Sequence, residues 1–211
     1  MKRHALLILG LLALAGAWFG PLPDIAHRAF FGHMTMHMII VAVAAPLLAL
    51  AIAGSRADPV GKWPALFPPL PVSLVEFAVV WAWHSPALHH AARHSVAGFA
   101  AEQGLFLVSG LLVWLAAFGG GRVERTNRIG AGVAALLLTA MHMTLLGALI
   151  ALSPRPLYPH AGGFAALTPL EDQHLGGAIM LVVGGVAYLA GGLWLMVELL
   201  GGRVRGKEEQ A

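Results

Sequence analysis

The sequence predicts an all-α protein, a polytopic bundle of transmembrane helices with six spans. Hydrophobic residues make up 58% of the 211 residues and charged residues only 11%, whereas a soluble globular domain carries about 25% charged residues. The mean hydropathy is +0.77. The apolar residues also fall into runs of roughly 20, the length that a helix needs to cross a bilayer. Because the connections are short, residues 1–211 are expected to form a single integral membrane domain.

Most of the predicted spans begin or end at a recognisable signal. The first follows Lys2 and Arg3, and it is expected to stay uncleaved because no small-x-small cleavage site precedes Pro21. The third is entered through a proline-rich stretch and ended by the Ser85–Pro86 pair. The predicted spans are residues 5–22, 34–54, 70–88, 98–118, 129–152 and 174–200, followed by a cytoplasmic tail at 201–211.

The distribution of Lys and Arg predicts that both termini are cytoplasmic. Basic residues are enriched in the cytoplasmic connections of membrane proteins. With the N-terminus inside, ten basic residues fall in the inner segments and three in the outer ones. The inner ones are Lys2, Arg3, Arg56, Lys62, Arg122, Arg125, Arg128, Arg203, Arg205 and Lys207, and the outer ones are Arg28, Arg93 and Arg155.

In this orientation the histidines gather in the outer half. Only His4 is inside, and the other ten lie in outer connections or the outer halves of spans. They are His27, His33, His37, His84, His89, His90, His94, His142, His160 and His174. Such segregation is not expected of scattered structural histidines. Of these, the loop residues His89, His90, His94 and His160 are expected to be solvated rather than ligating.

The outer half also holds the candidate metal ligands. His33 and His37 are four residues apart, so they share one helix face, with Met34 and Met38 on an adjoining face. Ionisable groups within a span are costly and indicate function. The predicted ligands, expected around one outer cavity, are His33, His37, His84, Glu102, His142, Met143 and His174.

The ligand types predict monovalent copper rather than zinc. The chain has no cysteine, and thioether sulfur suits monovalent copper but not zinc. The alternative is that each Met fills space and each His is a satisfied polar group, with His84 capping the third span. No nucleophile–base pattern, phosphate loop or nucleic-acid signature occurs, so neither an enzyme nor a nucleic-acid-binding protein is indicated.

An ordered set of motifs from about Phe31 to Tyr188 resembles the CtaG family of membrane proteins, assembly factors for caa3-type cytochrome c oxidase. The motifs are His33-Met-Thr-Met-His37, Ala45-Pro46-Leu-Leu, Trp83-His84-Ser-Pro86-Ala-Leu, Glu102-Gln-Gly-Leu-Phe-Leu with Gly110 and Trp114, Met141-His142-Met-Thr-Leu-Leu-Gly147, Pro154-Arg-Pro-Leu-Tyr158 and Asp172-Gln173-His-Leu-Gly176-Gly177. Two positions depart from the family pattern. Gln103 follows Glu102 where the family usually has His, and Pro46 stands where it usually has two prolines.

The resemblance implies a role in oxidase maturation at the copper centres, in the bacterial plasma membrane, with an oxidase subunit and the lipid bilayer as partners. Copper is then the expected cargo of a non-enzymatic factor. One alternative is a haem b protein with axial pairs such as His37 with His142 or His84 with His142. Another is a metal-free scaffold for an oxidase subunit. A copper or proton transporter is less favoured, because the inner halves of the spans offer only Glu76 and Glu198 as carboxylates.

Overall fold

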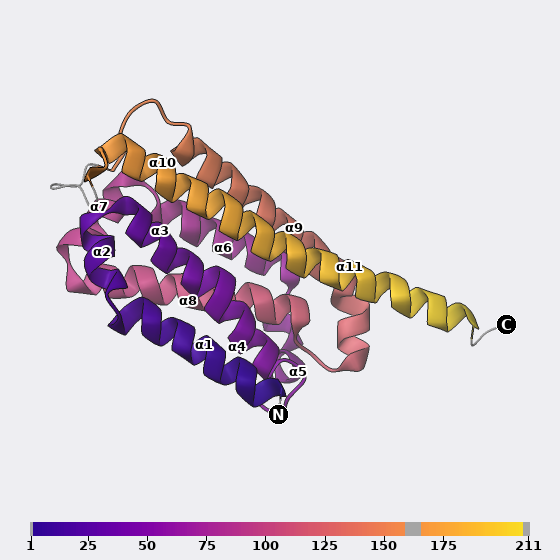
Figure 1. Ribbon diagram of the computed structural model, residues 1–211. Coiled ribbons are helices and arrows are strands. Elements are labelled where there is room, and N and C mark those ends of the chain that lie inside the picture. Colours follow the sequence, from indigo (N-terminus) through magenta and orange to yellow (C-terminus); the bar gives the residue numbers. More distant parts are fainter. Residues whose placement is uncertain (1, 159–165, 209–211) are drawn as a thin grey trace.

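The computed structural model describes residues 2–158 and 166–208, and their side chains except those of 122–127 and 202–208. All regular structure in these residues is helical, which confirms the predicted fold class. The helices run roughly alongside one another as a bundle (Figure 1). The short helices α2 (Leu22–Arg28) and α7 (Pro86–His94) lie at one end, and the start of α1 (Lys2–Phe19) and the end of α11 (Gly185–Glu208) lie toward the other. We call the end with α2 and α7 the histidine end.

Within the described residues, five stretches are long and apolar enough to cross a membrane. They are α1 (Lys2–Phe19), the continuous run α3–η1–α4 (Phe30–Ile52), α8 (Val96–Phe118), the apolar part of α9 (Arg122–Ala151) from residue 128, and Pro169–Gly201, which comprises α10, η4 and most of α11. The remaining predicted span corresponds to α6 (Pro69–Trp83), an apolar helix of 15 residues. Six spans is therefore an approximate description.

The prediction of a helix over 70–88 is wrong at its end. Helix α6 ends at Trp83, and α7 begins at Pro86. The chain turns between them because a residue before proline is driven into the extended region, and Ser85 has φ −66° and ψ 139°. The connection that follows is thus a helix, α7, rather than an open loop. At the opposite end of the bundle, α5 (Pro59–Lys62) and the 3₁₀ turn η2 (Pro64–Leu66) connect α4 to α6.

The sixth span also begins earlier than predicted. Helix α10 (Pro169–Ile179) starts at Pro169 rather than at residue 174, because Thr168 and Glu171 form a reciprocal capping box. Asp172 lies in the first turn of this helix and accepts hydrogen bonds from the backbone N–H groups of Phe30 and Phe31, at 2.7 and 2.8 Å. Its carboxylate therefore caps α3 (Phe30–Met38) from across the bundle.

Two helices carry a π-helical turn in the middle of their span. One is η1 (Ile39–Ala44), which leads into α4 (Ala45–Ile52), and the other is η4 (Met180–Gly184), which leads into α11 (Gly185–Glu208). Pro46 has no N–H to donate to the preceding turn, and a carbonyl there must find another partner. The Val41 carbonyl accepts from Trp114 Nε1 at 3.0 Å and from the Tyr188 hydroxyl at 3.4 Å.

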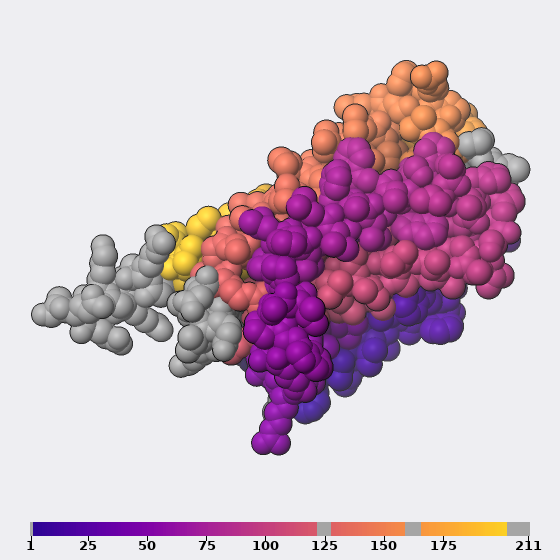
Figure 2. Space-filling model, turned by 180° about the vertical axis from the view of Figure 1, so that it is seen from behind, coloured from indigo at the N-terminus to yellow at the C-terminus, as the bar shows by residue number. Residues whose placement is uncertain are grey.

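The run α3–η1–α4 packs against α1, α8 and α10, while α9 packs against α6, α8, α10 and α11. Seen from behind, the side chains of α6 to α8 form a continuous magenta surface and α1 shows at its lower edge (Figure 2). Small residues let α10 approach α9 closely. A Cβ atom on Gly177 would lie 2.4 Å from the backbone nitrogen of Ala151.

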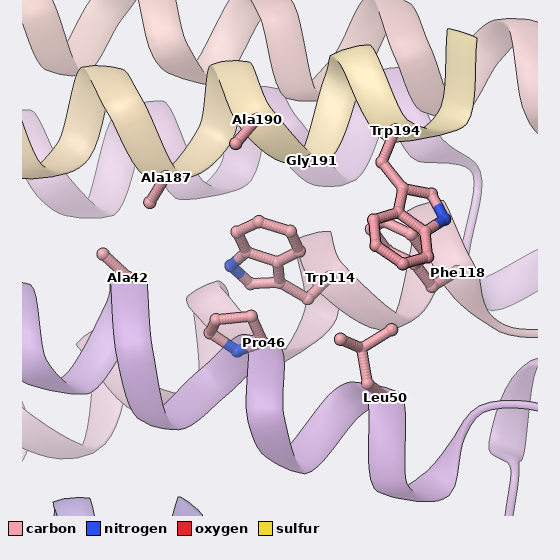
Figure 3. Close-up of a pocket in the computed structure, with 9 residues that line it drawn as sticks. All are labelled: Ala42, Pro46, Leu50, Trp114, Phe118, Ala187, Ala190, Gly191 and Trp194. Carbon is pink, nitrogen blue, oxygen red and sulfur yellow. The ribbon is translucent and has the colours of Figure 1, made fainter. Parts of the chain in front are cut away.

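An apolar groove of about 400 Å³ opens between α4, α8 and α11 (Figure 3). Its lining residues are Ala42, Pro46, Leu50, Trp114, Phe118, Ala187, Ala190, Gly191 and Trp194. Figure 3 shows the indole of Trp114 in the middle of this set, between α4 and α11. None of these lining residues is a predicted metal ligand.

Candidate functional site

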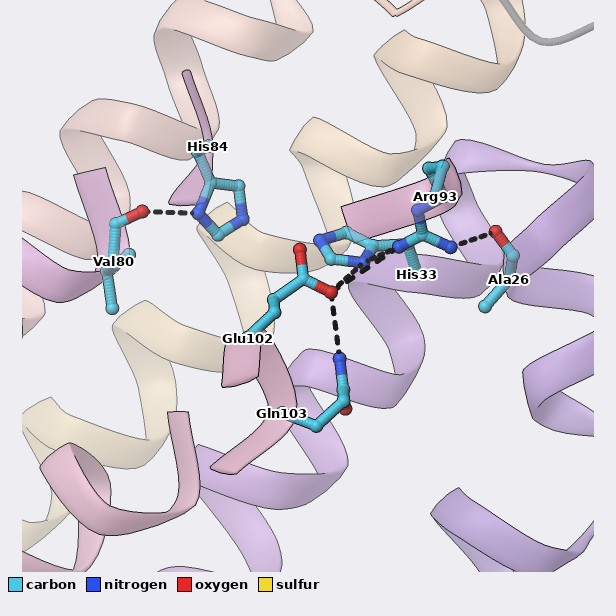
Figure 4. A network of polar contacts seen from close by, with 7 residues as sticks. All are labelled: Ala26, His33, Val80, His84, Arg93, Glu102 and Gln103. Atoms are coloured by element: carbon cyan, nitrogen blue, oxygen red, sulfur yellow. Dashed lines mark hydrogen bonds and ion pairs between the residues drawn. The ribbon is translucent and has the colours of Figure 1, made fainter. Parts of the chain in front are cut away.

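Four imidazoles and one carboxylate meet inside the histidine end of the bundle. His33 and His37 come from α3, His84 from the end of α6, His89 from α7 and Glu102 from α8, and none is more than 4% exposed. The ring centroids of His33 and His89 are 4.8 Å apart, and those of His37 and His84 are 5.1 Å apart. We call these five residues the histidine cluster. Most of its polar contacts are drawn in Figure 4.

The spacing of the residues within each helix explains how they meet. His33 and His37 are one turn apart and their rings lie nearly parallel, with centroids 6.5 Å apart. On α8, Glu102 and Phe106 are likewise one turn apart, and the Phe106 ring lies 4.0 Å from that of His37. One face of α3 and one face of α8 therefore bound the cluster, while α6 and α7 close it.

His84 is oriented by the backbone of its own helix. Its Nδ1 lies 2.6 Å from the Val80 carbonyl oxygen (Figure 4), so Nδ1–H is the donor and Nε2 carries the lone pair. No described residue donates a hydrogen bond to that Nε2. The turn after His84 is held by Tyr158, whose hydroxyl donates to the His84 carbonyl at 2.5 Å. Burial raises the pKa of Tyr158, so the hydroxyl keeps its proton.

Glu102 is balanced by a nearby arginine. The Nη2 atom of Arg93 lies 3.7 Å from Glu102 Oε2 and donates a hydrogen bond to His33 Nδ1. Its Nη1 donates to the Ala26 carbonyl at 2.6 Å, and Gln103 Nε2 donates to Glu102 Oε2 at 3.1 Å (Figure 4). Burial lowers the pKa of Arg93, and the Glu102 carboxylate opposes this shift. The Glu102 carboxylate therefore stabilises the protonated, positively charged form of Arg93.

Three members of the cluster are close enough to share one metal ion. A ring nitrogen of His33, one of His89 and a carboxylate oxygen of Glu102 all lie within 4.8 Å of one another. The expectation that His89 is solvated is wrong, because the residue is 4% exposed. Within the short helix α7, His89, Ala92 and Arg93 follow the i, i+3, i+4 spacing of one face, and that face is turned inward.

His142 lies beside the cluster rather than in its centre. It is 3% exposed on α9, so it is inside the bundle and not turned to lipid. Its ring packs edge-on against Phe77 at 5.3 Å, and the imidazole is within electrostatic range of His37. Among the described residues neither of its ring nitrogens has a hydrogen-bond partner.

The structure does not bring His174 to the cluster. Asp172 on the same helix faces α3, and a residue two positions further on lies about 200° around the helix axis. His174 accordingly points away from α3, and its Nε2 lies 3.0 Å from the Ser153 carbonyl oxygen. His160, which the sequence placed in the third outer connection, is outside the described residues.

Methionines that lie next to the histidines in the sequence pack against α10 and η4. Met34 packs against Gly176 of α10, and Met38 packs against Gly184 of η4. Met143, which the sequence placed among the ligands, contacts the same Gly184. Met141 is 62% exposed on the outside of the bundle. Met34, Met38 and Met143 therefore occupy packing positions against α10 and η4, which suits the role of methionine as a gap-filling residue.

A second polar group lies deeper in the bundle, and sequence reasoning assigned it no role. Glu76 of α6 is fully buried and accepts a hydrogen bond from the Tyr188 hydroxyl at 2.5 Å. Nearby, the Ser73 and Thr139 hydroxyls are 2.8 Å apart. These contacts join α6 to α9 and α11, and they account for a polar residue at each of these positions.

The cluster has unused capacity to bind a cation. Buried polar atoms in proteins almost always have partners, because an unsatisfied one costs free energy. Here four buried ring or carboxylate atoms have no hydrogen-bond partner among the described residues, namely His37 Nδ1, His37 Nε2, His84 Nε2 and Glu102 Oε1. The Nε2 atom of His33 also has no partner, but it carries the ring proton because Nδ1 accepts from Arg93. Imidazole nitrogen with one carboxylate oxygen is a donor set that suits first-row transition metals.

The comparisons with known proteins agree with the sequence motifs. A family model described as "Cytochrome c oxidase caa3 assembly factor" matches residues 1–201. No curated protein and no solved structure matches the chain.

Proposed function

The chain belongs to the family of cytochrome c oxidase caa3 assembly factors, and on that premise we propose that it holds a copper ion as cargo in the histidine cluster. The ion is passed to an oxidase subunit during maturation of the copper centres. The chain acts without catalysis, in the plasma membrane of a bacterium. The histidine end faces outward and both termini face the cytoplasm, as the distribution of Lys and Arg predicts.

The observation that carries this proposal is the set of buried, unpartnered ring nitrogens. His84 resembles a prepared ligand, because its Nδ1–H is bound to a backbone carbonyl and its Nε2 lone pair is free. Histidines that bind metals nearly always donate their other N–H in this way. His37 and His142 add further nitrogens close by. More ligands than one ion needs suit a carrier, which has to release its cargo.

The ligand set changes one part of the sequence argument. The preference for monovalent copper over zinc rested on methionine sulfur, and Met34, Met38 and Met143 pack against α10 and η4. Histidine and carboxylate ligands suit both copper and zinc. Copper is proposed here because of the role of the family. The proposed ligand atoms are now nitrogen and oxygen only. Residues His33, His37, His84, His89 and Glu102 hold the ion, with His142 beside them.

A haem b site fits the packing poorly. An axial pair needs two imidazoles on opposite faces of a flat macrocycle. The Phe106 ring packs against both His37 and His84, at 4.0 and 5.7 Å, and fills the space between α8 and these rings. His142 is in turn packed against Phe77. The pairings of His37 or His84 with His142 would therefore require the bundle to open.

The competing proposal is a metal-free scaffold that grips an oxidase subunit. The ion pair of Arg93 with Glu102 favours it, because it neutralises the carboxylate without any metal. Under this alternative the histidines serve to join helices. The two proposals differ in one measurable respect, which is whether the purified protein binds copper through the cluster.

The test is metal analysis of the detergent-purified protein after anaerobic loading with monovalent copper and removal of excess. Wild type should retain copper, and His37→Ala and His33→Ala should each lose most of it. His90→Ala is the matched control, because His90 is exposed on α7 and lies outside the cluster. Oxidase activity in copper-limited cells should fall with the cluster variants only. Full copper retention and full oxidase activity in both cluster variants would refute the copper proposal and favour the metal-free scaffold.

A further inference from the structure

The position of Arg93 bears on how a cation reaches the buried cluster, an inference that rests on the proposed function. Its side chain is only 8% exposed, although it comes from the short outer helix α7. On its inner side the guanidinium contacts His33 and Glu102. On its outer side the same residue lines a cleft of about 250 Å³. Arg93 thus stands between the cluster and the surface.

The guanidinium occupies the position that a metal ion needs. His33 Nδ1 lies 3.7 Å from Glu102 Oε2, and Arg93 Nη2 is bound to that nitrogen and lies 3.7 Å from that oxygen. A neutral imidazole has one lone pair. Because His33 Nδ1 accepts from Arg93, its lone pair is already used, and Nε2 must carry the proton. His33 can therefore bind a metal through Nδ1 only after Arg93 has moved away.

The outer cleft offers ligands of the same type as the cluster. It lies between α2, α7 and the start of α8, and its lining includes His27, His94 and Phe99. Both histidines are exposed, so the cleft is open at the surface. The His27 ring packs against Phe99 with centroids 5.6 Å apart. The cleft also gives the Arg93 side chain a space to enter when it leaves His33.

We propose that this cleft is the entrance to the buried site, and that Arg93 is a built-in cation that closes it. A copper ion binds first at His27 and His94, displaces the guanidinium into the cleft, and takes its place between His33 and Glu102. The exchange replaces one positive charge by another, so the charge buried beside Glu102 stays balanced. When the ion leaves, Arg93 returns and the cluster is again neutralised without metal.

The experiment compares the affinity and the loading rate of monovalent copper in the full-length protein in detergent, by competition with a coloured chelator and by stopped-flow mixing. Arg93→Met should bind copper at least roughly tenfold more tightly, because the variant removes the repulsion between the guanidinium and the ion. Two unit charges about 4 Å apart at a protein surface repel each other by more than a tenfold change in affinity requires. It should also load faster. Arg93→Lys keeps the charge but cannot bridge Ala26 and His33, so its affinity should stay near wild type while loading becomes faster.

The double variant His27→Ala/His94→Ala tests the cleft. It should load more slowly than wild type and reach the same final affinity. The control is His4→Ala, because His4 is exposed on α1 and does not line the cleft, and this variant should match wild type in both. If wild type binds copper but Arg93→Met and Arg93→Lys both match it in affinity and rate, the closing role of Arg93 is refuted and the copper site stands. Unchanged loading in the double variant would refute the entrance. Failure of wild type to bind copper would instead refute the proposed function.

Discussion

The Nδ1 atom of His84 lies 2.6 Å from the Val80 carbonyl oxygen, one helical turn earlier, and this contact makes the imidazole a prepared ligand. His84 directly follows Trp83, the last residue of α6, and its backbone N–H donates to the same carbonyl at 3.1 Å. The sequence left two interpretations of His84 open, a helix cap and a ligand. The geometry is compatible with both, because the nitrogen used for capping is not the one that faces the cluster.

We predict that His84→Ala lowers the affinity for monovalent copper at least about tenfold, since even the loss of an outer-shell partner of a metal ligand costs 10–100-fold. The measurement is chelator competition on the purified variant. An affinity equal to that of wild type would exclude His84 from the ligands. Far-ultraviolet circular dichroism should show the same helix content in both proteins.

Asp172→Ala should destabilise the junction of α10 with α3. The carboxylate accepts two backbone N–H bonds at the start of α3, and a hydrogen bond to a charged group contributes about 1.5–3 kcal/mol. Thermal unfolding in detergent should show a lower midpoint for Asp172→Ala than for Asp172→Asn, which keeps one oxygen acceptor. Equal midpoints for wild type and Asp172→Ala would show that the capping contact adds no stability.

Gly177→Ala tests the close approach of α10 to α9. The added Cβ would lie 2.4 Å from the backbone nitrogen of Ala151, so the helices must separate, at a cost of about 1–3 kcal/mol. Gly130→Ala on α9 is the matched control, because nothing lies within 4 Å of its Cβ position. The control should be neutral or slightly stabilising. A Gly177→Ala protein as stable as the control would contradict the described packing.

The topology predicted from the basic residues is tested with reporter fusions. Fusions after Ser55 and Gly119 should read as cytoplasmic, because both positions are at the end of the bundle away from α7. A fusion after Gly162, which is outside the described residues, should read as external. An external signal at Gly119 would invert the orientation and place the histidine end inside.

Much of the cluster was predictable because the rules for a membrane are simple. His33 and His37 share a face by their four-residue spacing. Glu102 and His142 had to face inward because a polar group in hydrocarbon is costly. Both arguments depend only on residues within a span, and the structure places all four side chains inside the bundle.

The rest depended on where helices begin and end. His89 and Arg93 were placed in an open loop, yet the Ser85–Pro86 turn starts a new helix whose inward face carries both. His174 was expected in the cavity, but α10 begins at Pro169 and directs Asp172, not His174, toward α3. The methionines share a helix with the histidines, but only the neighbouring helices decide which face meets the cluster and which meets α10.

The central claim is that copper binds within the histidine cluster, and X-ray absorption spectroscopy of the copper-loaded wild-type protein tests it most directly. The account predicts a first shell of nitrogen and oxygen atoms only, with the outer-shell scattering typical of imidazole, and the loss of that scattering in His33→Ala/His84→Ala. A first shell that contains sulfur would move the ion to the methionines. That result, or a spectrum unchanged in the double variant, would contradict the assignment of the cluster as the copper site.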